Sequence, residues 1–170
     1  MDSSQKEFNL KPIGYVRIEG DDPMNAEYFI DLLDPYRAAL KELDKFSHVI
    51  VFWWADQNDN EEARSVLETT PPYGDDPPST GIFATRAEYR PNPIAITTVN
   101  IIKVDQKKGF VKIPYIDAFK GTPVVDLKAY FPICDRVRDA HIASWLKDWP
   151  EWYEDGAAWW AEQGFFEEEG

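Results

Sequence analysis

The segment that most constrains the fold is residues 47–55, SHVIVFWWA, in which Val, Ile, Phe and Trp follow one another without interruption. β-Branched and aromatic side chains favour strands because they pack well on a pleated surface. A short apolar run of this kind is typical of a buried strand, and it is much too short to cross a membrane as a helix. We therefore expect residues 47–55 to form a buried strand of a sheet.

Other short segments have strand character and are separated by turn-forming residues such as GDDP at 20–23 and KKG at 107–109. Repeated short strands joined by turns predict a mostly β, barrel-like or sandwich fold with a few short helices, α+β by content. The predicted strands are residues 8–19, 28–33, 47–55, 81–85, 94–104, 110–116 and 124–127.

Residues 35–46, PYRAALKELDKF, are predicted to form a helix. Proline suits the first helical turn, and Tyr36, Leu40 and Leu43 recur at helical spacing. The polar residues 59–68 favour a short helix or strand, and the proline-rich residues 69–80 favour a loop.

Composition excludes several classes of protein. With 170 residues, of which 44% are hydrophobic and 15% aromatic, the chain is long enough for one globular domain with a real core. Its single cysteine, Cys134, allows neither an internal disulfide nor a cysteine metal cluster, and its two histidines, His48 and His141, have no metal-ligand spacing. We expect a cytoplasmic protein with no membrane segment and no metal.

The last thirty residues, 141–170, differ in kind from the rest. They hold five of the seven tryptophans, and they contain one lysine against eight acidic residues in a chain of net charge −13. We expect a C-terminal extension with short helices that packs on the domain of residues 1–140 or on a dimer partner. The acidic charge disfavours broad binding to nucleic acid, because phosphates need local cations.

Residues 81–96, GIFATRAEYRPNPIAI, carry the strongest local information. Pro91 and Pro93 bracket Asn92, so the backbone is rigid there. Arg86 and Arg90 lie four residues apart and suit a carboxylate or phosphate group. From the residues alone, two readings stay open: a ligand site, or a surface turn whose arginines pair with nearby acids.

A resemblance favours the ligand site. FATRAEYRPNPIAI at residues 83–96 resembles the FATRxxxRPNPIG signature of the TrmO/TsaA-like family. Residues 12–14, 43–57 (LDKFSHVIVFWWADQ) and 117–132 (DAFKGTPVVDLKAYFP) resemble further blocks of that family in the same order. Its best-known members are S-adenosylmethionine (SAM)-dependent methyltransferases acting on N6-threonylcarbamoyladenosine in tRNA. The resemblance implies a β-barrel enzyme that forms a homodimer, with SAM near the subunit interface.

Carried over position by position, the resemblance implies ten cofactor-binding residues. Asp56 stands where the family has a histidine, and aromatic faces such as Trp53, Trp54 or Phe119 suit the cationic sulfonium. The implied residues are Asp56, Gln57, Arg86, Arg90, Asn92, Ile96, Asp117, Ala118, Phe119 and Lys120. The sequence assigns no general base.

Three functions follow from these residues. The family default is methyl transfer to modified tRNA. The acidic tail favours a changed, small-molecule acceptor, since acids repel tRNA phosphates. The third reading is a SAM-binding regulatory or interaction module that has lost methyl transfer.

Overall fold

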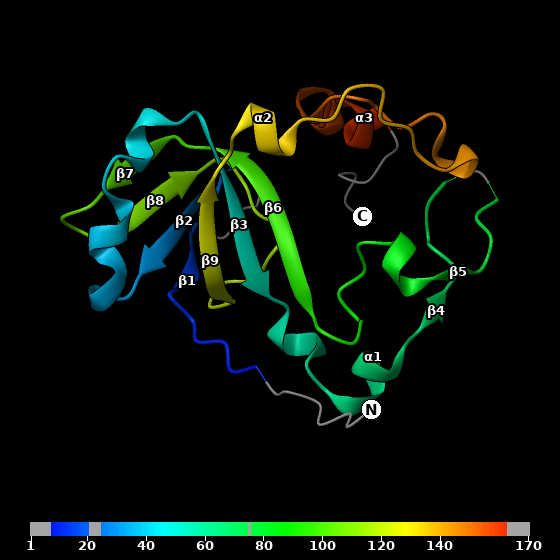
Figure 1. Cartoon of the computed structure of the whole chain (residues 1–170), viewed down its shortest axis with the longest axis horizontal. Helices are drawn as coiled ribbons and strands as arrows, with labels where there is room; N and C mark the ends of the chain where they lie inside the picture. Colours follow the sequence, from blue (N-terminus) through cyan, green and yellow to red (C-terminus); the bar gives the residue numbers. More distant parts are fainter. Residues whose placement is uncertain (1–7, 21–24, 75, 163–170) are drawn as a thin grey trace. The chain divides into compact units, whose positions relative to one another are not determined.

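The computed structural model describes residues 8–20, 25–74 and 76–162, and the chain divides into two compact units (Figure 1). The first unit comprises Met1–Leu67 and Ile82–Arg136, and the second comprises Glu68–Gly81 and Val137–Gly170. No helix among the described residues is long and apolar enough to span a membrane.

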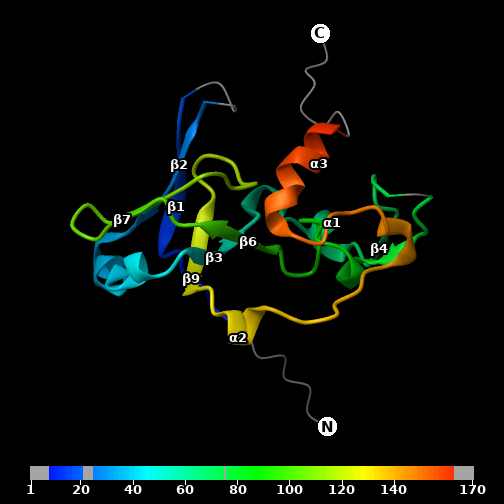
Figure 2. The same ribbon diagram turned by 90° about the horizontal axis from the view of Figure 1, so that it is seen from above.

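The first unit is built on one antiparallel sheet of seven strands, in the order β6-β3-β9-β1-β2-β8-β7 (Figure 1). β1 and β2 form a hairpin whose strands lie side by side in both Figure 1 and Figure 2. The structure confirms a mostly β fold with a few short helices. The strands are β1 (Gly14–Glu19), β2 (Glu27–Leu32), β3 (His48–Trp54), β6 (Ile94–Asn100), β7 (Lys103–Asp105), β8 (Phe110–Ile113) and β9 (Pro123–Ala129).

The predicted central strand is β3, which pairs with β6 on one side and β9 on the other. Its burial alternates: Val49, Val51 and Trp53 are buried, whereas the residues between them are half-buried. The continuous apolar run therefore covers one fully packed face and one partly exposed face, as expected for an antiparallel strand. The buried face contributes to the main core with Val16, Ile30, Val99, Val111 and Val124.

The two outer strands of the sheet, β6 and β7, follow each other in the chain with only Ile101 and Ile102 between them. In a flat sheet, seven strands about 4.8 Å apart would separate the outer strands by about 29 Å. The chain between β6 and β7 can span only about 10 Å. The sheet must therefore curl until its edges approach each other.

Backbone hydrogen bonds at this link show where the edges meet. The amide of Ile101 donates to the carbonyl of Ser47 beside β3, and the next amide, that of Ile102, donates to the carbonyl of Lys112 in β8. β6 and β7 themselves do not pair in the described part of the chain. The expected barrel-like arrangement is thus a curled but open sheet rather than a closed barrel.

The helix predicted over residues 35–46 is instead two short 3-10 helices, η1 (Asp34–Leu40) and η2 (Leu43–Lys45). Glu42 lies between them with φ 67°, in the left-handed region that interrupts a right-handed helix. Residues 59–68 contain the short helix α1 (Glu61–Ser65), which begins after Asn60, whose side chain accepts a hydrogen bond from the amide of Ala63. The helix α2 (Pro132–Asp135) follows β9.

Several predicted strands differ in extent from the observed ones: residues 8–13 precede β1, and residues 114–116 follow β8. In residues 81–85, only Gly81 lies in a strand, and the 3-10 helix η4 (Ile82–Ala84) follows. The hydroxyl and the amide of Thr85 both donate to the carbonyl of Ile82, which closes a turn in place of an extended strand. Residues 94–104 are divided between β6 and β7 at the corner of the curled sheet.

The second unit pairs the strands β4 (Glu68–Thr69) and β5 (Thr80–Gly81) and contains short helices in the C-terminal segment. These are η5 (Ser144–Leu146), η6 (Tyr153–Asp155) and α3 (Gly156–Glu162). The ring of Trp149 lies 5.2 Å from Tyr73, 5.5 Å from Trp159 and 5.3 Å from Trp160, measured between ring centroids. An aromatic cluster thus holds this unit together; packing of residues 141–170 on the first unit or on a partner stays a prediction.

Candidate functional site

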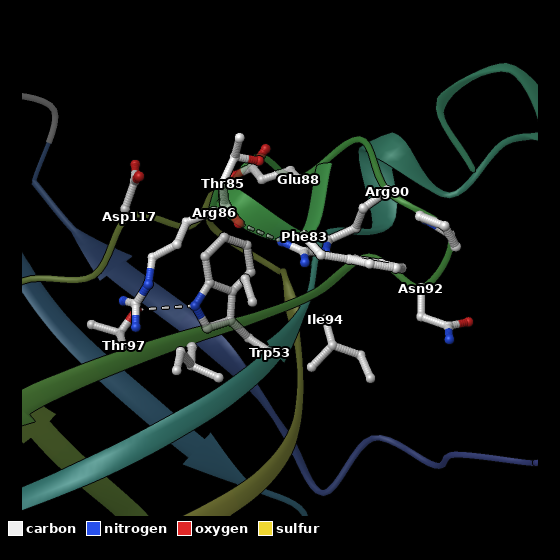
Figure 3. A pocket seen from close by; sticks show the side chains of 13 residues that line it. Trp53, Phe83, Thr85, Arg86, Glu88, Arg90, Asn92, Ile94, Thr97 and Asp117 are labelled. Carbon is white, nitrogen blue, oxygen red and sulfur yellow. Dashed lines mark hydrogen bonds between the residues drawn. The ribbon is translucent and has the colours of Figure 1, made fainter. Parts of the chain in front are cut away.

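A cavity of about 610 Å³ opens in the first unit at the end of β3 and the start of β6 (Figure 3). This is within the range of pockets that hold small molecules and cofactors. Three parts of the chain line it: the β3–β6 ladder, the connection over residues 83–92, and Asp117. The lining residues are Trp53, Phe83, Thr85, Arg86, Glu88, Arg90, Pro91, Asn92, Ile94, Ala95, Ile96, Thr97 and Asp117.

The proline-bracketed connection is anchored to the sheet and to α1. The amide of Ala55 donates to the carbonyl of Pro93 over 2.8 Å, which extends the β3–β6 ladder by one bond beyond Trp54. Arg64 of α1 donates from Nε to the carbonyl of Pro91 (3.0 Å) and from Nη2 to Oδ1 of Asn92 (3.3 Å). The rigidity expected from the two prolines is therefore reinforced by tertiary hydrogen bonds.

The two arginines of this connection have different surroundings. Arg90 is half-buried, and its Nη1 donates to the carbonyls of Thr85 and Ala87, both over 3.3 Å, so it closes the connection on itself. Arg86 is exposed, and its guanidinium reaches toward Thr97 in Figure 3. Among the described residues it has neither an ion-pair partner nor a hydrogen-bond acceptor. Arg86 is thus the cation of the cavity that remains available to a ligand.

Apolar side chains form one wall of the cavity. Trp53 is 5% exposed, and its indole Nε1 donates to Oγ1 of Thr97 on the paired strand over 3.0 Å (Figure 3). Phe83, Ile94 and Ile96 are 79%, 39% and 41% exposed. This combination of an ordered aromatic and exposed aliphatic and aromatic groups suits a flat, partly apolar ligand such as a purine.

Two carboxylates, those of Glu88 and Asp117, supply negative charge to the cavity. Glu88 is half-buried and its Oε2 accepts from Nδ2 of Asn58 over 3.0 Å. Burial, and then the negative charge of Asp117, raise the pKa of Glu88 above its usual value, while the bond from Asn58 opposes them. Burial and Asp117, which accepts a hydrogen bond from the phenol, raise the pKa of Tyr115 to about 12. The cavity therefore contains acids that a positively charged ligand group would stabilise.

Half of the sequence-predicted residues line this cavity: Arg86, Arg90, Asn92, Ile96 and Asp117. Asp56 and Gln57 do not; they are exposed in the 3-10 helix η3 (Asp56–Asn58), whose last residue is the partner of Glu88. Ala118, Phe119 and Lys120 follow Asp117 outside the lining, and Phe119 is 63% exposed. Their roles as cofactor contacts stay predictions.

Sequence reasoning missed three features of the site. Glu88 and Thr97 gave no signal, because each acquires its role through a partner 30 or 44 residues away, Asn58 and Trp53 respectively. Phe83 belongs to the matched motif but gave no indication of its exposure. Within the ranges 8–20, 25–74 and 76–162, no three His, Cys, Asp or Glu side chains are grouped to hold a metal ion.

Comparison with known proteins identifies the family. Residues 18–136 match the family described as the tRNA-methyltransferase O N-terminal domain. The chain belongs to this family. Its family relatives include a protein named as a probable S-adenosyl-L-methionine-binding protein from Methanocaldococcus jannaschii, 38% identical over 124 residues that make up 72% of this chain and 92% of the relative. A second, an S-adenosyl-L-methionine-binding protein from Archaeoglobus fulgidus, is 33% identical over 75% of this chain and 93% of the relative.

The fold of this TrmO N-terminal domain family member is also similar to a solved structure. The crystal structure of TrmO from Pseudomonas aeruginosa matches with a TM-score of 0.61 and 30% sequence identity, over 82% of this chain. The match covers 63% of the TrmO chain, so the present chain corresponds to less than two thirds of that protein.

Proposed function

We propose that this chain binds SAM in the cavity beside β3 and β6 and transfers its methyl group to an acceptor. The observation that carries the proposal is the guanidinium of Arg86, which lines the cavity and has no partner within the described part of the chain. A charged donor with no partner, next to an apolar wall, fits a ligand that combines a carboxylate with a purine. The SAM-binding names of the relatives support the same ligand.

Each part of SAM has a complementary part of the cavity. Arg86 would hold the carboxylate of the methionyl end, and Trp53, Phe83 and Ile96 would cover the adenine. Glu88 and Asp117 provide negative charge for the ammonium and the sulfonium. Asn92 and Arg90 would act on the ligand less directly, because Arg64 holds the amide oxygen of Asn92 and Arg90 is bonded to the connection itself.

The reaction requires little more than alignment from the protein. When bound, SAM would supply a methyl group on a positively charged sulfur. An acceptor nitrogen would form a bond to the methyl carbon as the bond from carbon to sulfur breaks, which would leave a neutral thioether, and the proton of the nitrogen would pass to water. The anchored connection holds the cavity wall fixed through the Ala55–Pro93 and Arg64–Pro91 bonds. A fixed wall favours transfer because a productive orientation of the two reactants supplies much of the rate.

Calorimetry with SAM tests the proposed site. Arg86→Ala is expected to weaken SAM binding by about 1 kcal/mol or more, about fivefold in Kd, through loss of a charged hydrogen bond. Arg138→Ala is the matched control, because it removes the same charge from an exposed residue outside the cavity. Absence of SAM binding to the unmodified chain, or equal affinity in all three proteins, would refute this site.

The acceptor is a separate part of the proposal. The family default is N6-threonylcarbamoyladenosine in tRNA, which is tested by radiolabelled methyl transfer to tRNA with and without that modification. The eight acids and single lysine of residues 141–170 favour the alternative of a small-molecule acceptor. Robust transfer to modified tRNA would exclude that alternative. SAM binding without transfer to tRNA or to small amines would favour a SAM-binding module without catalysis.

We propose further that the active form is a homodimer with the cavity near its interface. Phe83 and Phe119, on segments at and beside the cavity, are 79% and 63% exposed, and a dimer interface there would remove their apolar surface from water. Sedimentation equilibrium measures the assembly. A dimer that Phe83→Ser weakens is the expected result, and a monomer at all concentrations would contradict it.

A further inference from the structure

Glu88 has the most unusual surroundings of the side chains in the cavity. It is half-buried in the cavity wall, and one carboxylate oxygen, Oε2, is held by Asn58 at 3.0 Å. Its other oxygen has no hydrogen-bond donor among the described residues, and the carboxylate forms no ion pair within them. A partly buried carboxylate normally requires such partners. Glu88 is therefore fixed in place with an unused oxygen.

The arginines of the cavity do not serve as the missing partner. Arg90 is directed to the carbonyls of Thr85 and Ala87 (Figure 3), and Arg86 forms no ion pair with Glu88 among the described residues. The charge that shifts the pKa of Glu88 is that of Asp117, which is negative and raises it. A cation from outside the chain would offset both the cost of burying the Glu88 carboxylate and its repulsion by Asp117.

Figure 3 separates the two acids. Asp117 and the guanidinium of Arg86 are drawn to the left of the Trp53 ring, whereas Glu88 is drawn above that ring. The ammonium and the carboxylate of an amino acid share one carbon atom, so a ligand whose carboxylate binds Arg86 brings its ammonium to the Asp117 side. The sulfonium lies further along the ligand, and Glu88 is the other carboxylate in the lining that could face it.

We propose that Glu88 recognises the sulfonium charge and makes the site selective for SAM over its demethylated product, S-adenosylhomocysteine. The inference rests on the proposed SAM site. Both ligands carry the same ammonium, carboxylate and adenosine, and they differ in the charge on sulfur. A carboxylate about 5 Å from that charge in a partly solvated site gives a preference of about fivefold or more. Release of the product is favoured by the same difference.

Calorimetry with both ligands tests the assignment without measuring catalysis. The unmodified chain should bind SAM about fivefold more tightly than S-adenosylhomocysteine. Glu88→Gln keeps the shape and the acceptor for Asn58, removes the charge, and should bring the two affinities together. Asp117→Asn is the matched control, which should weaken both ligands equally and leave their ratio unchanged.

Several outcomes would overturn the inference. A Glu88→Gln protein whose ratio of affinities is unchanged would show that Glu88 does not sense the sulfur, and one that loses affinity for both ligands equally would place Glu88 at the ammonium. If Glu88→Gln does not fold, the pH dependence of the unmodified chain decides: the preference for SAM should fall as pH drops and Glu88 takes up a proton. The other charged groups of the cavity that face the ligand are Asp117, Arg86 and Arg90.

A ratio that is independent of pH down to about 4, the ordinary glutamate range, would equally contradict the inference. If SAM does not bind the unmodified chain, the proposed SAM site is refuted, and the inference with it. SAM binding with no preference over the product would refute the role of Glu88 alone.

Discussion

The hydrogen bond between Trp53 and Thr97 allows a quantitative test of how the cavity wall is built. It joins β3 to β6 over 3.0 Å, and Trp53 is 5% exposed. Trp53→Phe removes the donor and reduces the buried ring, and should lower the free energy of unfolding by about 2 kcal/mol, about half from the hydrogen bond. Thr97→Val removes the acceptor and leaves the indole N–H unpaired, at a cost of about 1–2 kcal/mol.

A double-mutant cycle separates the hydrogen bond from the packing. Because the bond is already lost in either single variant, the double variant should be less destabilised than the sum of the two by about 1 kcal/mol. Urea unfolding followed by far-UV circular dichroism avoids the signals of the other tryptophans. A coupling energy below about 0.3 kcal/mol, the usual scatter of additive sites, would refute the view that this bond stabilises the wall.

Two further predictions concern groups near the sheet. The phenol of Tyr115 should titrate at about 12 by NMR, and Asp117→Asn should lower that pKa because it removes a negative charge. The folded state holds this proton more tightly than the unfolded chain, whose tyrosine titrates near 10, so the free energy of unfolding should fall as pH rises from 10 to 12. A titration midpoint of Tyr115 near 10 in the folded protein would contradict this. Gly109→Ala should cost about 1–2 kcal/mol, because φ is +77° and the new Cβ would lie 2.3 Å from Nε of Arg37. Gly81→Ala, with open space around it, is the control, and equal melting temperatures for the two variants would refute the argument.

The parts of the fold that could be predicted from the sequence are those determined by local composition. The β-branched and aromatic run of β3 predicted a strand, and the prediction was correct because nothing in the tertiary structure opposes that preference. Ile82 shows the opposite case: its apolar character suggested a strand, but bonds from Thr85 to its carbonyl close a turn. Glu42 likewise interrupts a helix-like pattern, because its φ is in the left-handed region, and its residue type does not predict such a φ.

The same distinction applies to the candidate site. The motif around Arg86 and Asn92 could be recognised because its residues are consecutive. The separate roles of its residues could not be predicted, because they depend on partners that are distant in the sequence. Arg64, 28 residues before Asn92, donates to its amide oxygen, and Asn58, 30 residues before Glu88, donates to its carboxylate. Such partners are brought together only by the β3–β6 pairing and the connection anchored to it.

The link of Ile101 and Ile102 has a consequence for changes in chain length. Connections between strands usually tolerate added residues, because longer loops cost little conformational entropy. Here two neighbouring amides bond to opposite ends of the sheet, to Ser47 and to Lys112, so the shortness of the link sets how tightly the sheet curls. Insertion of a few glycines would remove that restraint without touching a core side chain. The position that resembles an ordinary surface connection is thus among the least tolerant of insertion in the fold.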